Sequence, residues 1–489
     1  MGDQRTPSRL SWLSRLRFTR IRPGRFRPTR LQSVRLPSDP GFWRSPLRGP
    51  YLTALLGAVL LAGITVLFVT GLLSYAAYNP ELRSNDRTPD HGLFGFYLFA
   101  WPTDPYWLYR LTQGVHTTVG VVLVPVLLAK LWSVIPKLFT MPPARSAAHA
   151  LERVSLLLLV GGVLFEFVTG LLNIQLDYLF PGSFYTLHFY GAWVFIAAFV
   201  VHVALRLPQA VRVLRDGPPD DLASGRRRRR KPGDKPADKP VDGAERGGPG
   251  RTESDRESDG EGAREPDRET GLVAPRPAAP TLTRRGALGA VGGGSVLLLG
   301  VTIGQNFDGP LRRTALLAPH GGTDPGTGAN AFQINKTAAA VGVTGEEAGN
   351  SWRLTIEGAH GRKLRFARAE LLKMEQHSAA LPIACVEGWS TSDQHWSGVR
   401  LRDLAELAGF DPRNGLPGVF VESLQRAGAF RHASLRDNQV RDPRSLLALR
   451  VGGADLSLDH GYPARVIVPA APGVHNTKWV TRLTFGADQ

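Results

Sequence analysis

The stretch Leu381-Pro-Ile-Ala-Cys-Val-Glu-Gly-Trp-Ser390 contains the only cysteine of this 489-residue chain. A single cysteine excludes an intrachain disulfide and a metal site made only of cysteines. Most lone cysteines act as small buried hydrophobic side chains. Here, however, a short apolar strand from Leu381 to Ala384 is expected to end at Cys385, and a glycine-containing turn follows it. A thiolate in such a place is a suitable ligand for a soft metal.

This motif and the following Trp396-Ser-Gly-Val-Arg-Leu-Arg-Asp-Leu404 resemble the sulfite-oxidase-like molybdopterin-binding domains. That group includes the catalytic subunit of the periplasmic methionine sulfoxide reductase. In these proteins the cysteine is the only protein ligand of molybdenum, and the pyranopterin supplies two further sulfurs. The resemblance therefore implies that Cys385 is the molybdenum ligand and the catalytic residue, while the cofactor supplies the redox chemistry.

A second stretch, Asp459-His-Gly-Tyr-Pro-Ala-Arg465-Val-Ile-Val-Pro469, is similar to the second signature of the same domains. The resemblance implies that His460, Arg465 and Lys478 hold the pterin and its phosphate. Fixed cationic donors suit a dianionic phosphate. Asn335 is a weaker candidate for the same site. The resemblance covers most of residues 330–489 and implies a mixed α+β domain.

Several segments are apolar enough to cross a membrane, which takes about 20 residues as a helix. They are Tyr51–Leu73, Leu111–Val134, Val154–Asn173, Thr186–Leu207 and the shorter, glycine-rich Gly286–Gly304. We therefore expect a transmembrane four-helix bundle and a fifth transmembrane helix ahead of the α+β domain.

The net charge of +17 is unevenly distributed, and this distribution indicates on which side of the membrane each segment lies. Basic clusters beside membrane segments mark the cytoplasmic side. The N-terminus and the run Arg226–Lys231 are therefore expected on the cytoplasmic side of the cell membrane. The C-terminal domain is expected on the extracytoplasmic side. No aromatic or base-reading motif accompanies these clusters, so nucleic acid is not an expected partner. The predicted parts are a basic arm 1–48, a membrane domain 49–207, a disordered linker 208–282, a fifth helix 283–304 and a domain 305–489.

The membrane segments contain an internal repeat. Phe68-Val-Thr-Gly-Leu-Leu73 in the first segment recurs as Phe167-Val-Thr-Gly-Leu-Leu172 in the third. Such repeats indicate a pseudo-symmetric bundle with its site at the repeat interface.

Histidines in spanning helices usually mark function. His116 and His188 are expected at the same depth on facing helices, as two axial ligands of a haem b would be. The nearby Gly114, Gly120 and Gly191 would leave room for the flat macrocycle, since glycine has no side chain.

The spacing of a third histidine raises the alternative of a second, inner haem. His202 follows His188 by 14 residues, which is about 21 Å of helical rise on nearly the same face. Lys130 stands where the repeat would place its partner histidine. The alternatives are ligation by Lys130 and His202, a single haem, a five-coordinate inner haem, or ligation by His149. Residues 51–207 resemble the dihaem cytochrome b subunits of formate dehydrogenases, apart from Lys130.

The stretch Thr283-Arg-Arg-Gly-Ala-Leu-Gly289 precedes the fifth segment and looks like a twin-arginine export signal. Plain positive-inside anchoring would use the same two arginines. A pterin–metal cofactor is loaded in the cytoplasm, so its domain must fold before it is exported.

Together these patterns predict a membrane-bound molybdenum oxidoreductase. Electrons would pass between a quinone pool, one or two b haems and an extracytoplasmic molybdenum centre that reduces an S-oxide or N-oxide. One alternative is a sulfite-oxidase-type enzyme that feeds electrons into the membrane. Another is a cofactor-free binding module on a haem-free anchor.

Overall fold

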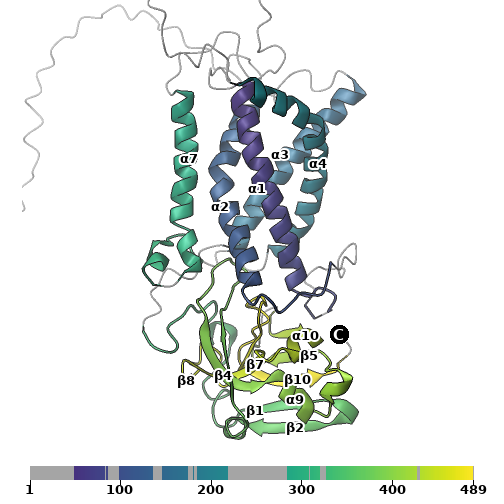
Figure 1. The fold of residues 1–489 in the computed structure, drawn as a ribbon, viewed down its shortest axis with the longest axis vertical. Coiled ribbons are helices and arrows are strands. Elements are labelled where there is room, and N and C mark those ends of the chain that lie inside the picture. The colour runs from purple at the N-terminus through teal and green to yellow at the C-terminus, as the bar shows by residue number, and fades with distance from the viewer. Residues whose placement is uncertain are drawn as a thin grey trace, which may run out of the picture.

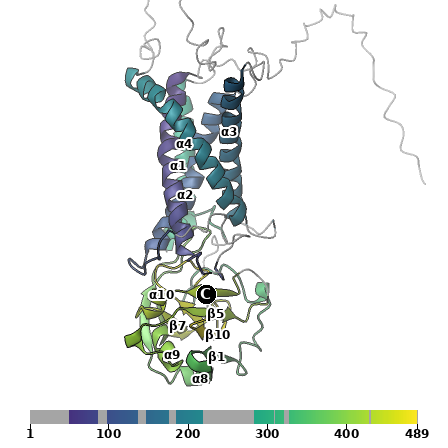
Figure 2. The ribbon, with the colours of Figure 1, turned by 90° about the vertical axis from the view of Figure 1, so that its right-hand side faces the viewer.

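The computed structural model describes residues 49–82, 84–85, 98–135, 146–174, 180, 184–217, 283–307, 309–319, 327–426 and 430–487, without the side chains of residues 148, 149 and 152. The predicted basic arm 1–48 and residues 218–282 of the predicted linker lie outside these ranges. Long helices form one end of the molecule and a strand-rich domain forms the other (Figures 1 and 2).

Each apolar segment predicted from the sequence is a helix. The helices are α1 (Pro50–Ala77), α2 (Leu108–Val134), α3 (Ala147–Asn173), α4 (Tyr185–Asp216) and α7 (Arg284–Gly300). By length and composition, all 5 could cross a membrane, the last when counted through to Asn306. Thr283 caps α7 by accepting a hydrogen bond from the Gly286 amide, so the twin arginines occupy its first turn.

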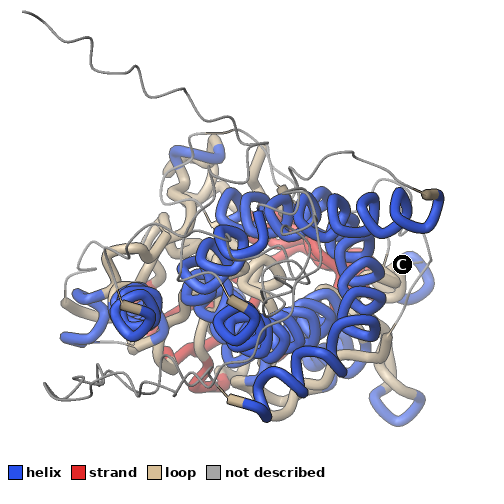
Figure 3. The backbone as a smooth tube through the Cα atoms, turned by 90° about the horizontal axis from the view of Figure 1, so that it is seen from above, coloured by secondary structure: helices blue, strands red, loops and turns tan. Residues whose placement is uncertain are grey.

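The helices pack pairwise, α1 against α2 and α3 against α4, and α1 also contacts α4. Viewed along their axes, they stand together above the strands (Figure 3). Helix α7 packs mainly along α2, and Ser295 on α7 donates a hydrogen bond to the Val122 carbonyl (2.9 Å). The fifth helix is thus attached to the bundle through α2.

Helix α4 is longer than predicted. It continues through Pro208 to Asp216, so residues 208–216 of the predicted disordered linker are helical. Proline removes one backbone hydrogen bond, but the next residues include strong helix formers such as Gln209 and Ala210. Arg215 in the last turn also suits the negative end of the helix dipole.

The C-terminal domain contains two five-stranded sheets. The first has the order β2-β1-β10-β5-β6, with β1 parallel to β10. The second has the order β3-β4-β7-β8, and β9 also pairs with β7. The strands are β1 (Arg353–Glu357), β2 (Lys363–Ala367), β3 (His377–Leu381), β4 (Gln394–Arg400), β5 (Val419–Ser423), β6 (His432–Leu435), β7 (Leu446–Val451), β8 (Ala454–Asp455), β9 (Arg465–Ile467) and β10 (Val480–Phe485).

Short helices complete this sheet-rich domain. They are α8 (Arg368–Leu371), α9 (Leu401–Leu407) and α10 (Asp437–Arg441), with 3-10 turns at Ile303–Asn306, Gly309–Thr314, Ala339–Val341, Ala359–Gly361 and Pro412–Asn414. Residues from both sheets, such as Leu354, Leu447 and Leu483, form one core cluster and are fully buried. Burying each such side chain stabilises the fold by roughly 1.5–3 kcal/mol.

The strand expected from Leu381 to Ala384 was misplaced. β3 ends at Leu381, where it pairs with Gln394 of β4. Pro382 follows and has no amide hydrogen for the ladder. Ala384 makes only an isolated bridge to Ser390. Cys385 therefore lies in a loop rather than at a strand end.

Candidate functional site

Cys385 is held at the start of a tight turn. Its amide donates to the Trp389 carbonyl (2.9 Å), and the Gly388 amide donates to the Cys385 carbonyl (3.0 Å). Gly388 has φ +95°, a backbone conformation that favours glycine. The thiol is buried and free, and it faces a cavity.

Glu387 is the polar neighbour of this thiol, and sequence reasoning did not single it out although it lies in the same motif. Its Oε2 lies 3.6 Å from the Cys385 Sγ and accepts a hydrogen bond from Trp389 Nε1 (2.9 Å). Burial, followed by the Glu387 charge, raises the pKa of the thiol well above its ordinary value. Metal binding here must therefore displace the thiol proton.

Lys478 and Asn335 lie together in the same cavity, although they are far apart in the sequence. The Lys478 ammonium donates to Asn335 Oδ1 (3.2 Å), the Lys336 carbonyl (2.6 Å) and the Asp459 carbonyl (3.0 Å). Burial, followed by the positive charge of Arg465, lowers the Lys478 pKa to about 7. An anion bound there would reverse that shift.

Arg465 and His460 form the neighbouring wall. The Arg465 guanidinium donates to the His460 carbonyl (3.0 Å) and the Asn476 carbonyl (3.1 Å). Burial lowers the Arg465 pKa to about 9. Burial and the Arg465 charge lower the His460 pKa to about 4, so this imidazole is neutral at neutral pH. Its Nε2 donates to the Phe332 carbonyl (3.0 Å).

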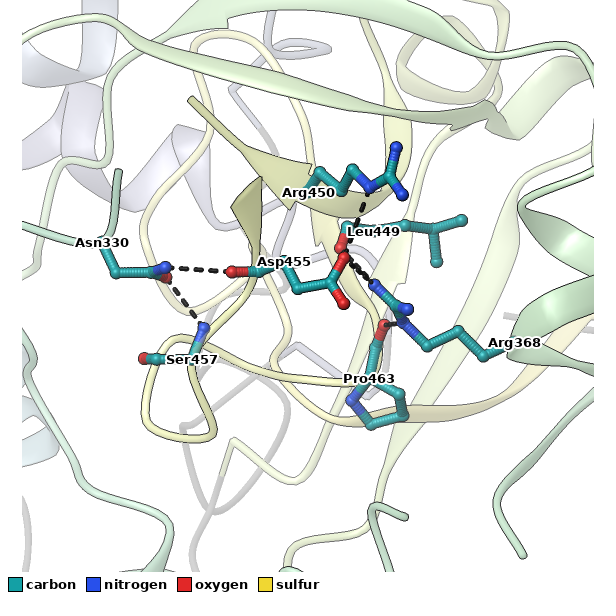
Figure 4. A network of polar contacts seen from close by, with 7 residues as sticks. All are labelled: Asn330, Arg368, Leu449, Arg450, Asp455, Ser457 and Pro463. Carbon is teal, nitrogen blue, oxygen red and sulfur yellow. Dashed lines mark hydrogen bonds and ion pairs between the residues drawn. The ribbon is translucent and has the colours of Figure 1, made fainter. Parts of the chain in front are cut away.

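A polar network fixes the turn that carries His460 (Figure 4). Asp455 accepts from Arg368 (2.7 Å), and Asn330 joins the Asp455 carbonyl to the Ser457 amide (3.0 and 2.8 Å). The Ser457 hydroxyl in turn lies 2.7 Å from His460 Nδ1. The imidazole is thus held at both ring nitrogens before any ligand binds.

Several buried polar atoms in this cavity lack a hydrogen-bond partner within the described part of the chain. They are both side-chain atoms of Gln333, Nε of Arg465, Nδ2 of Asn476 and Oγ1 of Thr477. An unsatisfied buried group costs about 1–3 kcal/mol, so the cavity fits a polar, anionic ligand. A pterin with a phosphate has the hydrogen-bonding groups and the charge that these atoms require.

The cavity continues into the helical bundle. Its volume is about 1160 Å³, and it is lined by Cys385 and Lys478 and also by His116 and His188. The Cys385 turn rests directly on α2, where Gln113 Nε2 donates to the Val386 carbonyl (2.5 Å). Sequence reasoning did not find Gln113, because no local pattern marks a contact between residues this far apart.

Gly388 allows this close contact between the turn and α2. A Cβ atom at Gly388 would lie 2.0 Å from Thr117 Oγ1. We expect Gly388→Ala to strain the backbone by roughly 1–3 kcal/mol and also to separate the turn from α2. The melting temperature of the C-terminal domain, measured in detergent, should then fall by about 2–4 °C for each kcal/mol of stability lost.

Gly453→Ala is the matched control for this variant. Gly453 also has positive φ, +81°, but a Cβ there meets nothing within 4 Å. The melting temperature of Gly453→Ala should therefore fall only by the effect of backbone strain. Equal melting temperatures for the two variants would contradict a tight contact between Gly388 and Thr117.

His116 and His188 face each other across the bundle end of the cavity. Their ring centres are 6.2 Å apart and their planes are nearly perpendicular, at 87°. Two imidazoles that share one metal at a bond length of about 2.0 Å have ring centres about 6 Å apart. A pair of imidazoles at this separation could hold one haem iron between them.

The glycines around these histidines differ from the prediction. Gly120 lines the cavity, but Gly114 packs against Asn306 and Gly191 packs against Glu166. These two allow close packing and leave no room for a macrocycle. Instead, the glycines of the internal repeat, Gly71 and Gly170, lie in the cavity wall beside the two histidines.

The residues predicted for an inner haem lie elsewhere. Neither Lys130 nor His202 lines the cavity that holds His116 and His188. The Lys130 ammonium donates to the Thr53 carbonyl (2.6 Å) in the first turn of α1. The side chain of His149 lies outside the described residues. Ligation by these three residues remains a prediction.

Comparison with known proteins addresses the C-terminal domain. Residues 341–489 match the family model described as the oxidoreductase molybdopterin binding domain. These residues form a molybdopterin-binding oxidoreductase domain of the sulfite oxidase type. This match, with the unpaired polar atoms of the cavity, argues against the cofactor-free binding module considered above.

The molybdopterin-binding domain has several curated relatives. Sulfite oxidase of Gallus gallus is 30% identical over 164 residues, covering 29% of this chain and 36% of that protein. The uncharacterized oxidoreductase YuiH of Bacillus subtilis is 28% identical over 134 residues, covering 27% of this chain and 65% of that protein. The chain thus spans about a third of the sulfite oxidase and about two thirds of YuiH.

A solved structure, the sulfane dehydrogenase SoxCD of Paracoccus pantotrophus, matches 28% of this chain and 38% of its own at 25% identity, with a TM-score of 0.25. A likeness this low adds no argument about the fold.

Proposed function

We propose that the chain is a membrane-bound molybdenum oxidoreductase that takes electrons from quinol through a haem b and reduces a neutral S-oxide or N-oxide. The molybdenum-molybdopterin, when bound, supplies the oxygen-atom transfer. Cys385 would be its protein ligand, and His460, Arg465, Lys478 and Asn335 would hold the pterin. In the net reaction, quinol gives two electrons and two protons, and the substrate oxygen leaves as water.

The observation that carries this proposal is the single cavity shared by the two domains. Cys385 and the paired histidines line the same space, so cofactors bound at its two ends would lie close together. Gln113 on the α2 helix joins the two ends through its bond to Val386, and His116 follows one helical turn later. This arrangement supports direct electron transfer within one chain, without a soluble carrier.

The proposed haem is held by His116 and His188, and one haem is enough for this route. The hydrogen bond from Lys130 to the Thr53 carbonyl supports the single-haem version. The proposed topology has five transmembrane helices in the cell membrane, a cytoplasmic N-terminus and an extracytoplasmic molybdenum domain. The basic N-terminal arm supports that orientation, and the arginines at the start of α7 fit twin-arginine export.

The charges around the thiol support a neutral substrate. Arg465 and Lys478 already bond to backbone and side-chain oxygens, and the pterin phosphate would engage their charge. The Glu387 carboxyl lies 3.6 Å from the thiol sulfur. It would repel an anion such as sulfite but would not repel an uncharged S-oxide.

A sulfite-oxidase-type reaction, with electrons passing into the membrane, is the second candidate because relatives of the domain carry that name. Haem absorbance in the purified protein distinguishes the two directions. We expect methionine sulfoxide to reoxidise the dithionite-reduced haem and sulfite to leave the oxidised haem unchanged. Reduction by sulfite alone would favour the second candidate.

Metal analysis of natively expressed protein comes before that assay. We expect about one molybdenum and one iron per chain, since each proposed site holds one metal ion. Two irons per chain would instead indicate that a second haem is bound. Material that contains neither metal would contradict the proposed function as a whole.

A further inference from the structure

The internal repeat makes one equivalent contact in each half of the bundle. Thr70, on α1, places its Oγ1 3.0 Å from Nδ1 of His116 on α2. Thr169, on α3, places its Oγ1 3.1 Å from Nδ1 of His188 on α4. Each threonine is the third residue of its Phe-Val-Thr-Gly-Leu-Leu copy, so the repeat in sequence corresponds to a repeated threonine–histidine contact.

The direction of these hydrogen bonds follows from the threonine. A hydroxyl has one hydrogen to donate, and each threonine donates it to its own helix. Thr70 bonds the Val66 carbonyl (2.7 Å) and Thr169 bonds the Phe165 carbonyl (2.8 Å). Each Oγ1 can therefore only accept from the histidine. The Leu67 carbonyl also lies 3.1 Å from His116 Nδ1, and the Glu166 carboxylate lies 3.1 Å from His188 Nδ1. All these oxygens accept, so Nδ1 must carry the hydrogen, which leaves the lone pair of each imidazole on Nε2.

The glycine of each copy leaves room for the same ring on another side, where a Cβ atom would crowd it. A Cβ at Gly71 would lie 3.3 Å from Cε1 of His116, and a Cβ at Gly170 would lie 3.2 Å from Cε1 of His188. Both imidazoles line the cavity. Among the described residues, neither Nε2 has a hydrogen-bond partner.

We infer that the Thr-Gly pairs of the repeat are positioning residues that fix the ring planes of the two histidines. Together with the Leu67 carbonyl and the Glu166 carboxylate they hold the hydrogen on Nδ1, so that both imidazoles present Nε2 to one metal. This inference rests on the proposed haem. Thr70 and Gly71 position the imidazole of His116, and Thr169 and Gly170 position that of His188. The 87° angle between the rings is then set by the repeat.

The test is the ferric EPR spectrum of the haem-loaded protein, because the angle between two axial imidazole planes sets the g-anisotropy of low-spin iron. Valine has the shape of threonine but cannot accept a hydrogen bond. We expect Thr70→Val and Thr169→Val each to shift the largest g-value. The double variant should also change the one-electron reduction equilibrium at least tenfold, which is a shift of ~59 mV.

Serine and a remote threonine provide the controls. Thr70→Ser and Thr169→Ser keep the hydroxyl and should keep the wild-type spectrum. Thr65 is a matched site on the same helix as Thr70, and within the described residues its hydroxyl bonds only the Leu61 carbonyl (2.8 Å). Thr65→Val should leave the g-values and the potential unchanged.

The outcomes separate this inference from the proposed function. Wild-type protein without haem would end the proposed function. Haem-loaded Thr70→Val/Thr169→Val protein with the wild-type g-values and potential would overturn the positioning role alone. If the valine variants lose haem and the serine variants retain it, the hydroxyl role is supported. Loss of haem in the serine variants as well would overturn it.

Discussion

Cys385→Ser should lower turnover of an S-oxide by at least about 1000-fold, equivalent to about 4 kcal/mol of activation free energy. Serine nearly matches the size of cysteine, but its hydroxyl does not replace a soft thiolate as a metal ligand. Electrons should come from a reduced viologen dye, so that the assay reports on the molybdenum site without the quinol route.

The same variant should keep its pterin and its haem spectrum. Arg465 and Lys478, which we propose hold the pterin, are anchored by bonds to other parts of the domain. The proposed haem ligands lie on α2 and α4. A variant that retains molybdenum, haem and full turnover would show that Cys385 is not the catalytic ligand. Loss of all cofactors together would instead indicate a folding defect.

The helical part of the fold could be predicted because membrane-spanning length is a local property. Each apolar segment, such as Tyr51–Leu73, proved to be helical and differed mainly at its ends. The rotation of each helix about its axis could not be predicted. Helix α1 is apolar on all sides, so its sequence does not show that Gly71 faces the cavity. Gly114 and Gly191 were therefore assigned to the wrong surroundings.

The cofactor residues of the C-terminal domain could be proposed from two motifs, since each motif is contiguous in the sequence. Asn335 was a weaker candidate, and the structure places it 3.2 Å from the Lys478 ammonium. The contact between Gln113 and Val386 joins residues 273 positions apart, and no pattern within either segment predicts it. Both residues line the shared cavity, which therefore became visible only in three dimensions.

His188→Ala should remove the low-spin haem spectrum and lower quinol-driven turnover by at least about 100-fold. Without its imidazole, the proposed haem iron would lose one of its two protein ligands, and the proposed route from quinol to the molybdenum site would be broken. Turnover with reduced viologen should stay within about twofold of wild type, because electrons then reach the molybdenum site directly. His116→Ala should behave in the same way.

His202→Ala is the matched control, since His202 lies on the same helix but outside the shared cavity. It should keep the haem spectrum and the iron content of the wild-type protein. If it lost half of the haem, a second, inner haem would be present. If it lost the same absorbance as His188→Ala, the assignment of the haem to the cavity beside Cys385 would be wrong, because the ligand would then lie at the opposite end of α4. Iron content and quinol-driven turnover should therefore be measured in all three histidine variants. The iron content shows where the proposed haem lies. The turnover shows whether a haem beside the molybdenum site carries electrons from quinol to the C-terminal domain.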